Sequence, residues 1–205
     1  MSAHAKTVIT ETEMYKKQMT LQRIVCYALL IAAVVVFIYS LGLVTDLYES
    51  LQPYSDPTKR KYVPGADIYL NIQPFNKQLT GAGIALILSA VSLFLFNTHK
   101  RRKYYIGNYV TIALNALMNV AVSVWMLVNI MAFKAQYLLI DFAKLAEQAD
   151  KYDTKYIEST LWFDIAVPVF ILLIAVTLVS LANLAFKVLL MKGERELIKE
   201  GAVEV

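Results

Sequence analysis

The chain has 205 residues, of which 58% are hydrophobic and 18% charged, and its mean hydropathy is +0.52. Soluble globular domains have roughly 45–50% apolar and about 25% charged residues, so this composition excludes an ordinary water-soluble domain. It also excludes a disordered chain, and the single cysteine excludes a disulfide-stabilised scaffold.

Four stretches of the chain lack Asp, Glu, Lys and Arg, and they mark the predicted membrane spans. They are 22, 22, 30 and 22 residues long, at 24–45, 78–99, 104–133 and 165–186. A helix needs about 20 mostly apolar residues to cross a bilayer core, and it must satisfy its own backbone hydrogen bonds there. We therefore predict an all-α integral membrane protein, a single domain over 1–205, with four transmembrane helices at approximately 22–46, 79–98, 105–133 and 162–187.

The first span is apolar on nearly all sides from Leu29 to Ile38. Its apolar run exceeds the roughly 7–15 residues of a signal peptide's hydrophobic region, so we expect a membrane span rather than a cleaved signal. The only cysteine, Cys26, lies near the N-terminal end of this span. A lone cysteine is usually a small buried hydrophobic residue, and palmitoylation beside the membrane is the alternative.

The first loop, 47–78, holds four of the chain's five prolines. Asp56-Pro57 and Pro64-Gly65 predict turns, and the alternation over 67–72 predicts a short strand. A loop of this length is long for a simple connection. We predict a structured cap, which either shields its own helix ends or binds a partner.

The second span carries small residues on one face, spaced at i, i+4, i+8 and i+11. Small residues allow another helix to approach closely in a membrane. The spacing predicts a packing ridge, used within the bundle or in an oligomer contact, made of Gly81, Ala85, Ser89 and Ser92.

A basic cluster follows this span and dominates the predicted orientation. With four spans, the two termini and this cluster lie on one side, which then has 12 of the 20 basic residues in short segments near the bilayer. The positive-inside rule places that side, and both termini, in the cytoplasm. The cluster is interpreted as a topology anchor, with binding of anionic lipid head groups as the alternative. Its members are Lys100, Arg101, Arg102 and Lys103.

The third span has an uncharged polar face. At 100° per residue, Asn115 and Asn119 fall within about 20° of Asn108, and Thr111 and Ser123 flank them. Polar groups in hydrocarbon need partners, so this face is expected to point inward. We predict interhelical hydrogen bonding, with a polar path for an ion or small solute as the alternative.

The second loop, 134–161, is predicted to contain a helix. Leu138, Phe142, Leu145 and Ala149 fall at i, i+4, i+7 and i+11, which is one face of a helix. The third span either continues unbroken to about residue 150 or kinks near 133–136. The two loops together predict a small extracytoplasmic lobe.

Asp164 opens the fourth span. A carboxylate in the first turn of a helix interacts favourably with the helix dipole, and we favour that role. The alternative is an ion or proton site at the outer mouth of the bundle.

The functional residues of the common enzyme classes are missing from the sequence. His4 and His99 are far apart and lack neighbouring ligands, and no phosphate loop or nucleophile motif is present. We expect no enzyme, no cofactor, no metal and, at a net charge of +4 without a basic stripe, no nucleic-acid binding. The predicted function is a structural or accessory subunit in the lipid bilayer, docking to a protein partner or to copies of itself. The alternative is a homo-oligomeric channel or transport component lined by the Asn face.

Overall fold

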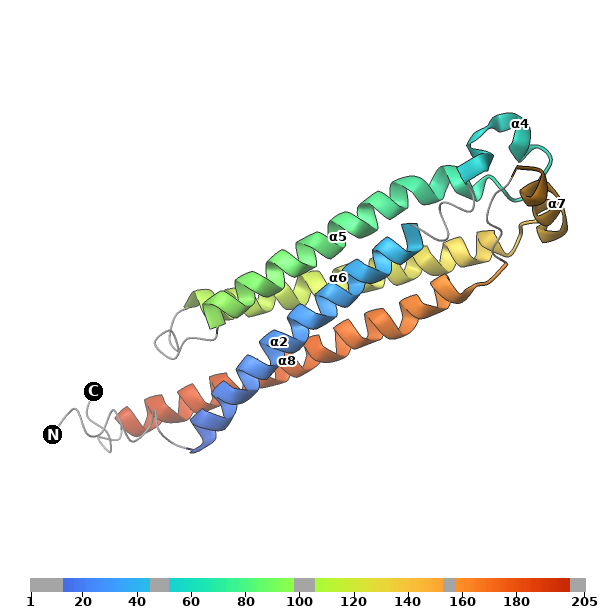
Figure 1. The fold of residues 1–205 in the computed structure, drawn as a ribbon. Coiled ribbons are helices and arrows are strands. Elements are labelled where there is room, and N and C mark those ends of the chain that lie inside the picture. The colour runs from blue at the N-terminus through green and yellow to red at the C-terminus, as the bar shows by residue number, and fades with distance from the viewer. Residues whose placement is uncertain (1–12, 45–51, 98–105, 153–157, 200–205) are drawn as a thin grey trace.

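The computed structural model describes residues 13–44, 52–97, 106–152 and 158–199 (Figure 1). All secondary structure in these ranges is helical. The elements in chain order are α2 (Glu13–Gly42), η2 (Gln52–Ser55), α4 (Pro57–Arg60), α5 (Ile68–Asn97), α6 (Ile106–Tyr137), α7 (Phe142–Tyr152) and α8 (Leu161–Lys199).

The four long helices form an elongated bundle in which each helix packs against two others. Helices α2 and α6 both contact α5 and α8 (Figure 1). Each of the four contains a segment long and apolar enough to cross a membrane: Met14–Gly42, Ile68–Asn97, Asn108–Tyr137 and Leu161–Gly193. This architecture confirms the prediction of an all-α protein with four candidate transmembrane helices.

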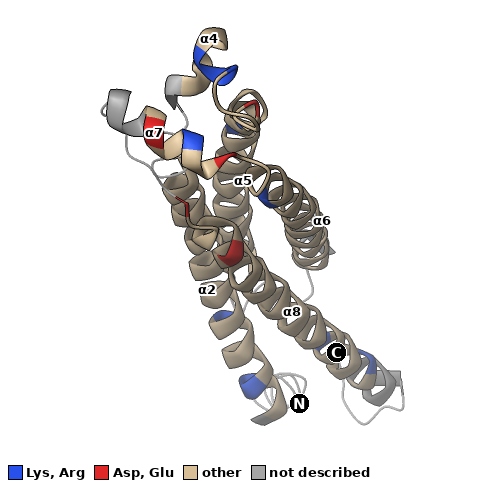
Figure 2. Ribbon diagram, turned by 90° about the vertical axis from the view of Figure 1, so that its right-hand side faces the viewer, with Lys and Arg blue, Asp and Glu red and all other residues tan. Residues whose placement is uncertain are grey.

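The outer surface of the bundle is apolar along most of its length. Large hydrophobic side chains such as Ile31, Leu88 and Leu117 are exposed on α2, α5 and α6. Figure 2 shows that the charged residues gather toward the two ends of the bundle. A bilayer covers such a surface, because its hydrocarbon core accepts apolar side chains and excludes charged ones.

Helix α5 begins earlier than predicted. The prediction of a short strand over 67–72 is wrong, because residues 68–72 belong to the helix. Ile68, Ile72, Phe75 and Leu79 lie at i, i+4, i+7 and i+11 and are all buried. Leu70, which a strand would place on the same face as Ile68, is 52% exposed. The helical period continues unbroken into the span, so it overrides the brief alternation of the segment.

The third span does not continue unbroken to residue 150, and that prediction is wrong. Helix α6 ends at Tyr137, a turn follows, and α7 starts at Phe142. Asp141 immediately precedes α7. The backbone N–H of Lys144 donates to Asp141 Oδ1 at 3.1 Å, and this hydrogen bond holds the pKa of the carboxyl below its usual range. The break lies just beyond the kink considered at 133–136, and Leu138, predicted on the buried stripe, is exposed.

Residues 52–67 and 138–152 pack together at one end of the bundle, and we call them the end lobe (Figure 1). The backbone N–H of Asp141 donates to the Pro64 carbonyl at 3.0 Å, which joins the two loops. Tyr54, Val63 and Ala66 are buried in the same core cluster as residues of the long helices. The first loop therefore covers its own helix ends, as one of its two predicted roles requires.

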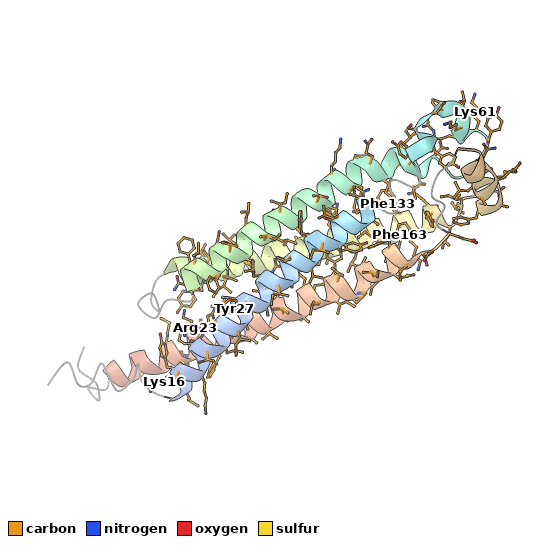
Figure 3. The ribbon with its side chains drawn as sticks, in the orientation of Figure 1. Lys16, Arg23, Tyr27, Lys61, Phe133 and Phe163 are labelled. Atoms are coloured by element: carbon orange, nitrogen blue, oxygen red, sulfur yellow. The ribbon has the colours of Figure 1, made fainter. Side chains whose placement is uncertain are left out.

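An aromatic layer lies beneath the end lobe. The Tyr137 ring centroid is 5.3 Å from that of Phe142 and 5.2 Å from that of Phe163, and the Phe75 and Phe133 centroids are 4.8 Å apart. Figure 3 labels Phe133 and Phe163 at this end of the bundle. Tilted and edge-on aromatic pairs stabilise packing beyond their buried area, so Phe142 anchors the lobe to α6 and the other pairs join α6 to α5 and α8.

Candidate functional site

The polar face of α6 points into the bundle. Asn108, Asn115, Asn119 and Ser123 are all at most 3% exposed, and Thr111 is half-buried. Their shared direction follows from the helical spacing, and burial is expected because unpaired amides in hydrocarbon are costly.

A chain of hydrogen bonds at the centre of this face joins three helices. The Asn115 amide donates to Ser89 Oγ of α5 at 2.8 Å. The Asn119 amide donates to Asn115 Oδ1 at 3.1 Å and to Thr177 Oγ1 of α8 at 3.0 Å. The two central asparagines are therefore bound within one chain and connect α6 to both of its neighbours.

A second polar contact between α5 and α6 lies at the C-terminal end of α5. The Asn97 amide donates to Thr111 Oγ1 at 3.0 Å and to the Leu93 carbonyl at 3.1 Å. The Thr111 hydroxyl in turn donates to the Asn108 carbonyl at 3.1 Å. Sequence reasoning missed Asn97 because it lies at the edge of its span, where a polar residue needs no special explanation.

Helices α2 and α8 are joined by buried amides as well. The Asn183 amide donates to Gln22 Oε1 at 2.6 Å, and the Gln18 amide donates to Asn183 Oδ1 at 3.5 Å. Gln22 also donates to the sulfur of Cys26 at 3.7 Å. Cys26 is fully buried, so its thiol occupies an interior position rather than one open to palmitoylation.

Lys187 of α8 is also inside the bundle, at 3% exposure. Its ammonium lies 5.3 Å from the ring centroid of Tyr109, and the Tyr109 hydroxyl donates to the Met191 sulfur. No carboxylate among the described residues pairs with it. In the sequence this lysine is only one of the basic residues that set the orientation. A buried cation in an apolar helix is a candidate functional residue.

The predicted ridge on α5 divides between two faces. Ser89 points toward α6 and accepts the bond from Asn115, whereas Gly81, Ala85 and Ser92 are exposed. A Cβ added at Gly81 would meet nothing within 4 Å, while one at Gly83 would lie 3.2 Å from Phe37 Cα of α2. Gly83, which the spacing did not include, is thus the residue that lets α2 and α5 approach closely.

Asp164 lies in the first turn of α8 and is half-exposed. Its Oδ1 is 2.5 Å from Lys134 Nζ at the end of α6, and Thr160 donates to its Oδ2 at 2.8 Å. The carboxylate therefore links the first turn of α8 to the end of α6, and its interaction with the helix dipole stays a prediction. Lys134 was not identified from the sequence, because 30 residues separate the pair.

Lys100, Arg101, Arg102 and Lys103 lie outside the described residues. Within the described ranges, no group of three or more His, Cys, Asp or Glu residues could hold a metal ion. The chain matches no protein-family model, no curated protein and no solved structure.

Proposed function

We propose that this chain is a non-catalytic integral membrane protein that acts as a structural or accessory subunit. It docks to a transmembrane helix of a protein partner or of a second copy. The observation that supports this proposal is the outward direction of Ala85 and Ser92, small residues of α5 that the chain's own bundle does not cover.

Small residues on a helix surface matter for association in a membrane. Apolar side chains gain nothing by leaving lipid, so helix association there depends on close packing and hydrogen bonds. Ala85 and Ser92 lie within about 20° of each other around α5 and about 10 Å apart along it, at 100° and 1.5 Å per residue. They present a narrow strip against which a second helix packs closely.

The proposed orientation has both termini in the cytoplasm and the end lobe outside. Helix α2 begins and α8 ends at the same end of the bundle (Figure 1). The basic residues in the segments near that end support this direction through the positive-inside rule.

Replacement of Ala85 and Ser92 by leucine tests the docking proposal. Bulky side chains on the strip hold a second helix away, so we expect loss of the oligomer or of the copurifying partner in native mass measurements in mild detergent. Ala175→Leu, on the exposed face of α8, is the matched control and leaves the assembly intact. A parent protein that is monomeric and free of partners under gentle extraction contradicts the proposal.

A second candidate function is a channel or transport component. The observation that favours it is the buried polar lining, in which Ser123 Oγ and Asn97 Oδ1 have no hydrogen-bond partner within the described ranges. Because the Asn face points into its own bundle, the path in this candidate runs through each chain rather than between copies. The hydrogen bonds of Asn115 and Asn119 oppose it, since a path requires them to separate.

A further inference from the structure

A groove lies between the end of α2 and the first half of α5, beside the end lobe. Its volume is about 510 Å³, within the range of small-molecule sites. The apolar part of the wall is Leu41, Val44 and Ile84. The polar part is four residues of α5: Gln73, Asn76, Lys77 and Thr80.

The Asn76 side chain makes no hydrogen bond with the described part of the chain. Its side chain is 4% exposed, lines the groove, and has no hydrogen-bond partner for either Nδ2 or Oδ1 in the described part of the chain. Burying an unsatisfied amide is costly, so the unmet Nδ2 donor indicates that something else supplies an acceptor there.

Along the α5 wall of the groove, Asn76 and Lys77 lie nearer the end lobe than the apolar Ile84 does. The charge-free run of α5 begins immediately after Lys77, so Asn76 and Lys77 lie where the hydrocarbon core starts. Ile84 lies roughly 10 Å deeper at 1.5 Å per residue. Between them, Gly81 leaves open space, since a Cβ there meets nothing within 4 Å.

We infer that this groove binds one glycerophospholipid with an anionic head group. One acyl chain lies along Leu41, Val44 and Ile84 over Gly81. The phosphate faces the exposed ammonium of Lys77, and the Asn76 amide donates to an ester carbonyl. The charge favours an anion, because none of the described residues that line the groove is acidic.

A lipid fits this arrangement better than a partner helix does. A phospholipid carries its polar and apolar parts in the same order as the α5 wall, where Asn76 and Lys77 precede Ile84. A partner helix would have to cover the ammonium of Lys77 and also place a polar side chain at the depth of Asn76. Covering a charge with an apolar helix is costly. This inference is independent of docking at Ala85 and Ser92, which do not line the groove.

The test measures lipid retention by native mass spectrometry of the full chain in mild detergent. Added dioleoylphosphatidylglycerol is compared with dioleoylphosphatidylcholine. The parent protein is expected to hold one phosphatidylglycerol in preference to phosphatidylcholine. Lys77→Gln removes one interfacial charge, so it should weaken phosphatidylglycerol binding about fivefold and leave phosphatidylcholine unchanged. Gly81→Leu fills the groove and should reduce both.

Two controls separate this site from other effects. Lys61→Gln removes an exposed lysine of the end lobe outside the groove and should leave lipid binding unchanged. Ala85→Leu should alter docking but not lipid retention, so the two proposals fail independently. Equal retention by the parent, Lys77→Gln and Gly81→Leu overturns the inference. So does equal binding of the two lipids, or loss of a bound protein chain rather than of lipid in Gly81→Leu.

Discussion

Gly65 shows how one residue joins the two parts of the end lobe. Its φ is +85°, a left-handed conformation that favours glycine, and a Cβ there would lie 2.7 Å from the Leu139 carbonyl oxygen and 2.8 Å from Ile140 Cα. The Pro64-Gly65 turn signal in the sequence is therefore also the point at which the 138–141 turn approaches the first loop. Only the turn was predictable, because the approaching backbone comes from more than 70 residues further along the chain.

Gly65→Ala is expected to loosen the end lobe. The left-handed conformation alone costs about 1–2 kcal/mol with a side chain, and the contact with backbone adds to it. We expect a lower midpoint of denaturant unfolding in detergent and faster amide exchange across 138–145.

The matched control for this variant is Gly193→Ala on α8. A Cβ at that position meets nothing within 4 Å, and alanine favours a helix by roughly 0.5–1 kcal/mol over glycine. That variant should be neutral or stabilised. Similar behaviour of the two variants would show that the close contact at Gly65 does not hold the lobe.

Among the helices, α6 is the one whose buried polar face could be predicted from the sequence. The spacing of Asn108, Asn115 and Asn119 predicted one inward face, and the structure buries all three. Their partners were not predictable, because Ser89 and Thr177 lie on other helices and look ordinary in sequence. The buried amides of Gln18 and Gln22 were missed for a similar reason, since their partner Asn183 lies on α8.

Asn119→Leu tests whether these bonds stabilise the bundle. The variant removes the donors to Asn115 Oδ1 and Thr177 Oγ1, and each interhelical bond contributes about 0.6–2 kcal/mol. We expect a loss of about 1–3 kcal/mol in the free energy of unfolding in micelles, and unchanged potassium flux in liposomes.

Asn129→Leu on the same helix is the control. The Asn129 amide donates to the Trp125 carbonyl of its own helix at 2.7 Å, so its removal should leave stability nearly unchanged. Full stability of Asn119→Leu combined with an altered flux would favour the channel function over the structural one.

The whole molecule has two chemically different ends, and their placement across the membrane is testable. Figure 3 shows Lys16 and Lys61 at opposite ends of the bundle. Cys26 is fully buried and is the only cysteine, so the parent chain provides a low background for thiol labelling.

Lys61→Cys should react with a membrane-impermeant maleimide in intact cells. Lys16→Cys should react only after permeabilisation, because the positive-inside rule places its end in the cytoplasm. The reverse labelling pattern would invert the proposed orientation and place the end lobe in the cytoplasm.

The sequence by itself determined the number of helices long and apolar enough to cross a membrane, their approximate positions and the inward face of α6. These properties are local, since the absence of charge and the 3.6-residue period can be read within one segment. Only the tertiary structure decided which amides pair, that Gly83 rather than the predicted ridge brings α2 to α5, and that Lys187 is buried. Those outcomes depend on which helices are neighbours. Neighbours are chosen by contacts between distant residues such as Gln22 and Asn183, which no single segment contains.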